Sequence, residues 1–180
     1  LNDDYRAQMF RYTNSFKEAR FLRAYFYFNL VRAYGDVPYF TEMVTTDQVN
    51  SLTRTPAQEI FNAIIAECDK LSTELPADYT KLGLDGIAPA ENGRVTCYAA
   101  LALKARAALY AASPLFNPEN NKDLWRRAAE ANKEVIETCT ANGFKLSKYS
   151  ELWGPNNWSN NEMIFVRRYN GNISTLEEYN

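Results

Sequence analysis

The residues from 14 to 34 constrain the fold most, because apolar side chains recur there at helical spacing on more than one face. Phe21 and Phe28 lie two turns apart on one face, and Leu22 and Phe26 lie on a second. A helix on the surface of a globular protein has one apolar stripe, whereas a helix that is apolar nearly all round is buried on several sides. The pattern therefore predicts a long helix packed among other helices.

A second helix is predicted over residues 55–75, where both ends carry recognisable signals. Thr55 is a favourable N-cap residue, Pro56 suits the first helical position, and Gln58 completes a Thr-x-x-Gln capping box. Pro76 ends the segment, because proline cannot continue a helix. The predicted apolar stripe consists of Ile60, Phe61, Ile64, Ile65, Cys68, Leu71 and Leu75.

Two further helices are predicted over residues 95–112 and 123–142. The first is rich in alanine, and small side chains let the backbones of neighbouring helices approach closely. The second begins at Asp123 as N-cap and is followed by Gly143, a residue suited to the left-handed turn after a helix. We expect Ile136 on the buried side of this last helix.

A short strand is predicted over residues 162–169 from their β-branched and aromatic content. A single strand cannot satisfy its own backbone, and we expect its partner to lie outside this chain. The predicted fold class is mainly α, with antiparallel helix pairs similar to tetratricopeptide units, long loops and a short strand near the C-terminal end. We expect residues 1–180 to form a single helical domain, the N-terminal portion of a longer protein.

The composition excludes several functions. The 180 residues contain no histidine, which excludes histidine-dependent catalytic triads and histidine-ligated metal sites within the chain. Cys68, Cys97 and Cys139 lie far apart without a Cys-x-x-Cys pair, so no zinc ribbon or thioredoxin-type motif is present. The formal net charge of −2 gives no overall attraction to nucleic acid. We therefore expect no metal, no cofactor and no nucleic-acid partner.

Candidate ligand-binding residues are concentrated between residues 153 and 161, a polar, turn-rich stretch with two tryptophans and four asparagines. Sugar C–H groups stack on aromatic faces, and amide groups form paired hydrogen bonds with hydroxyls. We name Trp153, Asn156, Asn157 and Trp158 as the candidate binding residues. The alternative is that both tryptophans pack this loop onto the preceding helix.

Four arginines lie on or beside apolar helices, namely Arg20, Arg23, Arg94 and Arg106. They could bind an anionic ligand, but a buried unpaired charge is costly, and we expect these arginines to pair with carboxylates. The expected partners include Glu18, Glu67 and Asp69.

Four groups of motifs occur in order along nearly the whole chain. They are EARFLRAYFYFNLV with YGDVP at residues 18–31 and 34–38, RTP at 54–56 opening a helix that ends in LP at 75–76, GRV at 93–95 with SPLFN at 113–117, and NEMIF at 161–165. In this order they resemble the SusD/RagB family of glycan-binding outer-membrane lipoproteins of the Bacteroidetes type.

The resemblance implies a non-catalytic receptor, surface-exposed and lipid-anchored at the cell outer membrane. It implies that the protein captures an oligosaccharide or other nutrient and delivers it to a TonB-dependent, SusC-like transporter. The lipid would be carried by an N-terminal cysteine that is not in this chain. Tetratricopeptide-like helices would form the scaffold, and irregular loops would hold the ligand.

Two other functions stay open from the residues alone. An α-helical glycosidase needs two carboxylates about 5–9.5 Å apart across a cleft, and Asp36, Glu42, Asp78 and Glu91 are its candidates. A tetratricopeptide-type adaptor that binds peptide tails needs a concave face lined with Lys, Arg and Asn. The predicted helix faces are apolar or alanine-rich, which disfavours the adaptor.

Overall fold

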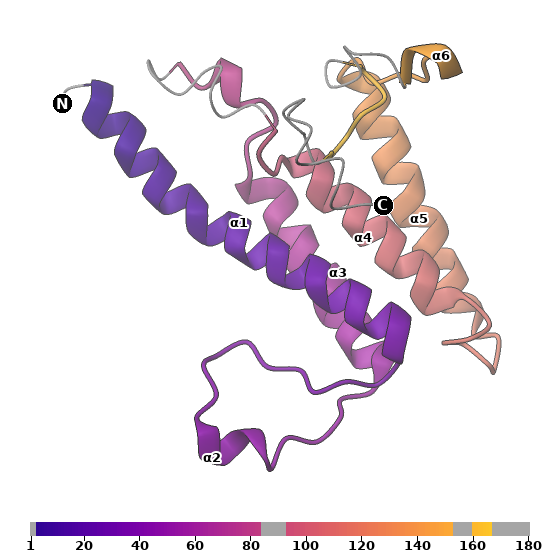
Figure 1. Cartoon of the computed structure of the whole chain (residues 1–180). Coiled ribbons are helices and arrows are strands. Elements are labelled where there is room, and N and C mark those ends of the chain that lie inside the picture. Colours follow the sequence, from indigo (N-terminus) through magenta and orange to yellow (C-terminus); the bar gives the residue numbers. More distant parts are fainter. Residues whose placement is uncertain (1–2, 84–92, 153–159, 167–180) are drawn as a thin grey trace.

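A computed structural model of the chain describes residues 3–83, 93–152 and 160–166 (Figure 1). Four long helices make up most of this part: α1 Asp3–Tyr34, α3 Ala57–Glu74, α4 Cys97–Ala112 and α5 Lys122–Ala141. Three single turns lie between or after them: α2 Thr46–Val49, the 3₁₀ helix η1 Tyr79–Lys81, and α6 Tyr149–Leu152. The predicted mainly α class is confirmed.

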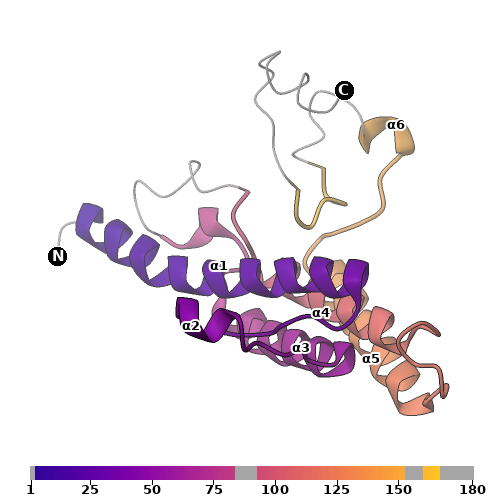
Figure 2. The ribbon, with the colours of Figure 1, turned by 60° about the horizontal axis from the view of Figure 1, so that its bottom comes forward.

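The long helices are packed in an antiparallel order, each running back along the one before it (Figure 1). The helix α4 lies between α3 and α5, and α1 lies against α3 and, less extensively, against α4 (Figure 2). The connections that follow α3 and α5 therefore lie at the same end of the bundle, the upper part of Figure 1. The antiparallel arrangement agrees with the prediction, whereas a tetratricopeptide-like repeat stays a prediction.

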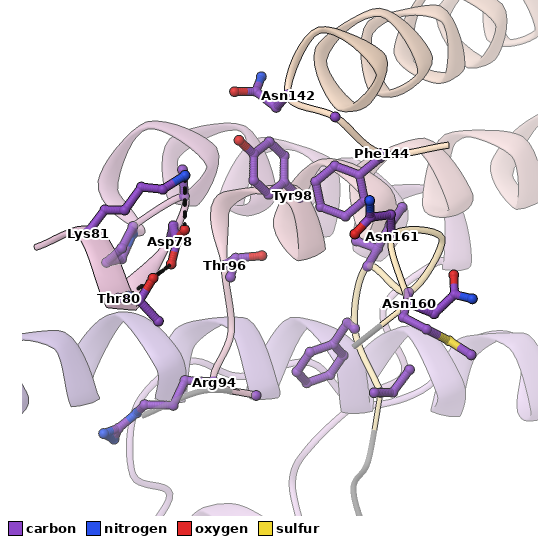
Figure 3. A pocket seen from close by; sticks show the side chains of 18 of the residues that line it. Asp78, Thr80, Lys81, Arg94, Thr96, Tyr98, Asn142, Phe144, Asn160 and Asn161 are labelled. Atoms are coloured by element: carbon purple, nitrogen blue, oxygen red, sulfur yellow. Dashed lines mark hydrogen bonds and ion pairs between the residues drawn. The ribbon is translucent and has the colours of Figure 1, made fainter. Parts of the chain in front are cut away.

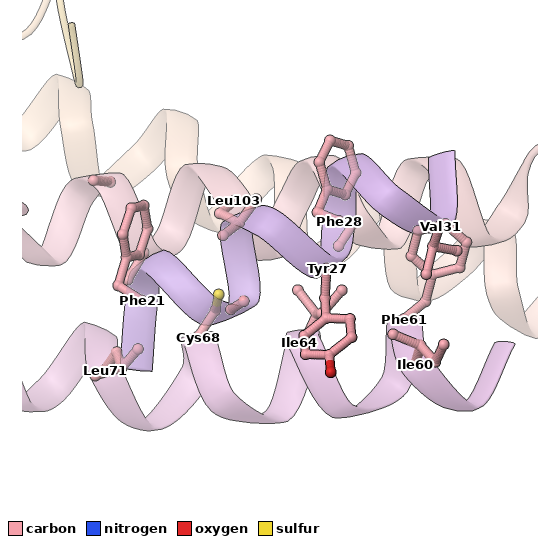
Figure 4. Close-up of a cluster of buried hydrophobic side chains, with 14 of the residues drawn as sticks. Phe21, Tyr27, Phe28, Val31, Ile60, Phe61, Ile64, Cys68, Leu71 and Leu103 are labelled. Atoms are coloured by element: carbon pink, nitrogen blue, oxygen red, sulfur yellow. The ribbon is translucent and has the colours of Figure 1, made fainter. Parts of the chain in front are cut away.

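Aromatic and aliphatic side chains from α1, α3 and α4 form the main core (Figure 4). The rings of Phe28 and Phe61 meet edge to face, and Phe116 covers Phe61 at 5.0 Å between ring centroids. A second, smaller cluster joins α4 to α5 and consists almost wholly of alanine, namely Ala105, Ala108, Ala112, Ala128 and Ala131. The alanine-rich pattern of α4 is thus explained by close approach of two helix backbones.

The start of α3 differs from the sequence prediction. The helix begins at Ala57, and no capping box forms around Thr55. Instead, the Asp36 carboxylate accepts a hydrogen bond of 2.7 Å from the backbone N–H of Ala57. The backbone N–H of Thr55 donates to the carbonyl of Val37 at 2.9 Å, and the two residues form an isolated antiparallel bridge. A carboxylate from the preceding connection therefore does the work that Thr55 was expected to do.

Gln58, the expected partner in that capping box, has a different role. Its side-chain amide donates to the backbone carbonyls of Ala111 and Phe116, both at 2.7 Å. These carbonyls lie at the end of α4 and just beyond it, so Gln58 ties the first turn of α3 to the far end of α4.

The predicted helices are otherwise present, with changed bounds and faces. The first begins at Asp3 rather than at residue 14. Its second face, which carries Phe26, is exposed, so α1 is not buried on several sides within the described residues. In α5 the N-cap is Asn121, whose side chain accepts from the N–H of Asp123 at 2.9 Å. Ile136 is 65% exposed, because α5 touches α4 mainly through alanines.

The predicted strand does not form in residues 162–166, which adopt a turn and a bend. The physical reason is the absence, within the described ranges, of any neighbouring strand with free backbone groups to pair with. Residues 167–169 of the predicted strand lie outside the described part of the chain. Among the helices that the structure describes, none is both long and apolar enough to span a bilayer.

Candidate functional site

The four candidate residues from the sequence, Trp153, Asn156, Asn157 and Trp158, all lie outside the described residues. The last part of the same asparagine-rich stretch, residues 160–161, is described and lines a pocket. Asn160 and Asn161 belong to the stretch singled out in the sequence but are not among the four ligand-binding residues predicted there. Their place two and three residues after Trp158 was the available signal.

The pocket has a volume of about 730 Å³ and lies at the end of the bundle where the connections after α3 and α5 meet (Figure 3). Its walls come from four segments that are distant in sequence: 76–82, 93–98, 142–144 and 160–166. The side chains that give it chemical character are amides, hydroxyls, charged groups and aromatic rings, among them Arg94, Thr96, Tyr98, Phe144, Asn160 and Asn161.

The wall formed by residues 76–82 is held by hydrogen bonds within its own turn. Asp78 accepts from the backbone N–H of Thr80 at 2.9 Å and from its hydroxyl at 2.6 Å. Lys81 completes the turn with an ion pair of 3.2 Å to Asp78. The Thr80 hydroxyl, and then its backbone N–H and Lys81, lower the pKa of Asp78 and keep it ionised.

Tyr79 anchors this wall to two helices. Its ring is buried, and its hydroxyl lies 2.8 Å from the backbone carbonyl of Val95, to which it donates. The same hydroxyl accepts from the side-chain amide of Asn14 at 2.8 Å. Burial raises the pKa of the Tyr79 phenol well above its usual value, so the group stays neutral. The 76–82 segment is thereby fixed to α1 and to the entry of α4.

The carboxylate of Glu18 joins that anchor to the next wall. It accepts from Arg94 Nε at 2.8 Å and from the Asn14 amide at 3.1 Å. The predicted pairing of Arg94 is therefore confirmed. Arg20 also pairs as expected, at 2.5 Å from both Glu67 and Glu74.

The remaining arginines differ from one another. Arg23 lies 3.9 Å from Glu67, so its pairing is also found. Arg106 stands over the ring of Phe28 at 5.5 Å from the centroid, a cation–π contact in place of the expected carboxylate. Asp69, a predicted partner of the arginines, pairs with Lys104 at 2.5 Å.

The opposite wall is formed by two segments that run side by side. The backbone N–H of Lys145 donates to the carbonyl of Asn161 at 3.3 Å. Ser147 donates through its hydroxyl to the Asn160 side chain at 2.7 Å and through its backbone N–H to the Glu162 carboxylate at 2.8 Å. These bonds hold residues 160–162 against the chain that leaves α5.

The floor of the pocket combines aromatic rings with an unpaired hydroxyl. Tyr98 is buried and meets Phe144 edge to face at 4.9 Å between ring centroids. The Thr96 hydroxyl oxygen is buried and has no hydrogen-bond partner within the described part of the chain. A buried polar group of this kind is satisfied by water or by a ligand hydroxyl. Figure 3 shows Thr96, Tyr98 and Phe144 facing the same space as Asn161.

The chemistry of the site is suited to holding a polar ligand. No group of three histidine, cysteine or acidic side chains that could hold a metal ion occurs in the residues that the structure describes. The three cysteines are free thiols, and burial raises the pKa of Cys68 to about 12, which leaves it a protonated, inert core residue. The pocket thus presents donors, acceptors and rings for recognition.

The described residues form an all-α structure with a pocket built by the connections at one end of its helices. A family model described as starch-binding and associating with the outer membrane, the SusD-like family, matches residues 1–109. Since this match covers more than half of the chain, the protein belongs to the SusD-like family. The resemblance found in the sequence motifs is confirmed.

Relatives and solved structures agree with this assignment. The chain is 25% identical over 149 residues to SusD-like protein P25 of Formosa agariphila, and 27% identical over 162 residues to SusD-like protein P2 of the same organism. These matches cover 82% and 88% of this chain but 24% and 28% of the relatives. The chain therefore spans about a quarter of the length of the curated relatives it matches.

Two solved structures from Bacteroides fragilis are similar as well. A SusD-like protein matches with a TM-score of 0.66 and 29% identity over 85% of this chain and 27% of its own. A SusD-like carbohydrate-binding protein matches with a TM-score of 0.62 and 30% identity, over 83% of this chain and 26% of its own. Surface glycan-binding protein A of Bacteroides uniformis shares the fold, with a TM-score of 0.61 and 23% identity over 83% of this chain and 29% of its own.

Proposed function

We propose that this chain is the N-terminal portion of a non-catalytic glycan-binding protein at the outer-membrane surface. The observation that carries the proposal is the pocket of about 730 Å³, built by connections on a SusD-like helical frame and lined by amides, hydroxyls and rings. The carbohydrate-binding relative of similar fold supports it. In this protein the helices provide the frame, and the connections provide recognition.

The pocket surface matches the two kinds of group that a sugar presents. A pyranose ring has C–H faces that pack on aromatic rings, and Phe144, half-buried and backed by Tyr98, is in place for that contact. Its hydroxyls both donate and accept, as does the Asn161 amide. The stretch with Trp158 directly precedes this wall and extends the binding surface in our proposal.

Two of the candidate glycosidase carboxylates, Asp36 and Asp78, lie at opposite ends of α3. Asp36 caps the start of α3, whereas Asp78 follows its end. An α-helix of 18 residues is about 27 Å long, far beyond the 5–9.5 Å that a catalytic carboxylate pair requires. Glu91 lies outside the described residues. The distance between Asp36 and Asp78 therefore excludes these two as a catalytic pair.

Isothermal titration of the full-length protein with starch-derived and other oligosaccharides tests the proposal. We expect saturable binding with no new reducing ends after long incubation. Trp158→Ala and Asn161→Ala should each weaken binding while the melting temperature stays nearly unchanged. New reducing ends would refute the non-catalytic assignment, and a loss of several kcal/mol in stability for Trp158→Ala would show that this ring is part of the core.

The transporter and the lipid anchor are part of the same proposal. We propose that the full-length protein carries an N-terminal lipid, sits on the outer membrane and passes its ligand to a TonB-dependent, SusC-like transporter. Mass spectrometry of the native N-terminus detects the lipid, and purification from detergent-solubilised outer membranes detects the transporter. A full-length protein that is unlipidated and cytosolic would refute this part.

A further inference from the structure

Cys97 and Cys139 lie at the same end of the packed helix pair α4 and α5. Cys97 is the first residue of α4, and Cys139 lies two residues before the last residue of α5. Because the two helices are antiparallel and packed against each other, the start of α4 lies beside the end of α5 (Figure 1). Both cysteines are free thiols in the structure, Cys139 buried and Cys97 half-buried.

The alignment of the two helices places these cysteines at nearly the same height. The side-chain amide of Asn132 donates to the carbonyl of Ala105 at 3.4 Å, which fixes one point where α5 lies beside α4. Cys97 lies eight residues before Ala105, and Cys139 lies seven residues after Asn132. Both are displaced in the same direction along the helix axes, by about 12 Å and about 10.5 Å. They therefore differ in height by only about 1.5 Å.

Both cysteines also lie on the facing sides of their helices. Ala108 of α4 and Ala128 of α5 belong to the alanine cluster that joins these helices. Cys97 lies eleven residues before Ala108, and Cys139 lies eleven residues after Ala128. Eleven residues turn an α-helix by three full turns and only about 20° more. A disulfide needs its two Cα atoms about 4.4–6.8 Å apart, and an interface of small residues brings two helix backbones close enough for such a bond.

The residues beside the two cysteines are in contact with each other. The backbone N–H of Phe144 donates to the carbonyl of Cys139 at 3.0 Å. The Phe144 ring meets the ring of Tyr98, the residue after Cys97, at 4.9 Å between ring centroids (Figure 3). Burial chiefly raises the pKa of the Cys97 thiol, and the nearby Cys139 contributes to the rise. These contacts place the two thiols together independently of the helix alignment.

We propose that Cys97 and Cys139 form an intramolecular disulfide when the folded protein meets a disulfide donor. The thiolate of Cys97, the more exposed of the two, attacks the donor disulfide and bonds to one of its sulfurs, while the other sulfur leaves as a thiolate. The thiolate of Cys139 then attacks the Cys97 sulfur and expels the second donor sulfur. The two thiols lose two protons and two electrons in all, and the donor disulfide is reduced to two thiols.

The bond would act on the pocket as well as on the helices. Tyr98 and residues 142–144 line the pocket, so a disulfide beside them fastens two of its walls to each other. Disulfides persist in oxidising compartments, and the proposed location at the outer-membrane surface lies in one. For the source of the donor, the inference rests on the proposed function, whereas the placement of the two cysteines does not.

Cys68 provides a matched control, because it is a cysteine of the same helix bundle at a different height. Lys104 pairs with Asp69, the residue after Cys68. Lys104 lies seven residues, or about 10 Å, beyond Cys97 along α4. Cys68 is also fully buried in the main core. Cys68→Ala should therefore leave the disulfide unchanged.

Oxidation of the reduced full-length protein in a glutathione redox buffer tests the proposal. Remaining thiols are trapped with iodoacetamide, and linked peptides are identified by mass spectrometry without reduction. We expect a bond between Cys97 and Cys139 in more than about nine chains in ten, since structural disulfides resist reduction by glutathione. Cys68→Ala should give the same result, and the same treatment in urea should give mixed pairings of the cysteines.

The possible outcomes decide the proposal. Free thiols at Cys97 and Cys139 after this treatment overturn it, as does a glutathione adduct that persists on Cys97. A bond from either residue to another cysteine, or to a second copy of the protein, overturns it as well. A full-length protein that is unlipidated and cytosolic refutes the proposed location, but the glutathione measurement decides by itself whether these two cysteines pair.

Discussion

The hydroxyl of Tyr79 is predicted to stabilise the protein by about 2 kcal/mol, a value that follows from its surroundings. Tyr79→Phe keeps the buried ring, so no cavity forms and the loss is confined to hydrogen bonds. The Val95 carbonyl loses the hydroxyl at 2.8 Å, and the Glu18 carboxylate loses the same hydroxyl at 3.1 Å. The Asn14 amide loses the acceptor at 2.8 Å but keeps Glu18 at 3.1 Å. A buried group left without its partner costs about 1–3 kcal/mol.

The assay is urea unfolding followed by circular dichroism, with Tyr98→Phe as the matched control. Tyr98 is also buried, but its hydroxyl makes no hydrogen bond within the described ranges. We therefore expect Tyr98→Phe to leave the unfolding midpoint nearly unchanged, while Tyr79→Phe lowers it at unchanged m.

A second comparison tests whether the cluster acts as a unit. Asn14→Ala should cost less in the Tyr79→Phe background than in the wild type, because one of its two described hydrogen-bond partners is already gone. If Tyr79→Phe changes the free energy of unfolding by less than about 0.5 kcal/mol, or no more than Tyr98→Phe does, the hydroxyl merely offsets its own desolvation and the reasoning is refuted.

Three further predictions concern the helical frame. Phe61→Ala should lower the free energy of unfolding by about 3–5 kcal/mol in the same assay, and a loss below about 1 kcal/mol would mean that the core around it refills the space. Burial raises the pKa of the Cys68 thiol from 9.0 to about 12, so between these pH values the thiol ionises only in the unfolded protein. The free energy of unfolding should therefore fall from pH 9 toward pH 12 by at most about 1.4 kcal/mol per pH unit. Cys68→Ala should make this fall with pH less steep. An unchanged slope in Cys68→Ala would contradict this account. Asp36→Ala should lower the free energy of unfolding by about 1 kcal/mol and speed amide hydrogen exchange at Ala57, and Asp36→Asn should lower it less. Equal exchange rates at Ala57 in the wild type and both variants would show that the Asp36 cap is not needed.

The helices were predictable from the sequence because their signals are local. Apolar spacing located α3, α4 and α5 to within a few residues, and Gly143 has the positive φ of 86° that its place after α5 predicted. The helix α1 was placed too short because residues 3–13 lack a continuous apolar core face. Local signals do not reveal which of two apolar faces a neighbour covers, so the exposure of Phe26 was missed.

The helix start and the pocket were less predictable, because their partners come from distant residues. The cap of α3 is a carboxylate 21 residues before Ala57, and no local pattern indicates such a partner. The pocket gathers four segments between residues 76 and 166, and their meeting follows only from the antiparallel order of the helices. The asparagine-rich stretch indicated one wall, and the anchor formed by Tyr79 and Asn14 left no signal in the spacing.

The bridge between Val37 and Thr55, together with the cap from Asp36, closes residues 38–54 at their base. This bridge and this cap hold the end of α1 and the start of α3 together, whichever residues the loop beyond them contains. Its length can therefore change at small thermodynamic cost, since doubling a flexible loop costs only about 0.6 kcal/mol. Residues 39–41 contact α1 through Tyr39, Phe40 and the Thr41 carbonyl, so the part beyond Thr41 is the place for an insertion or for fusion of a reporter.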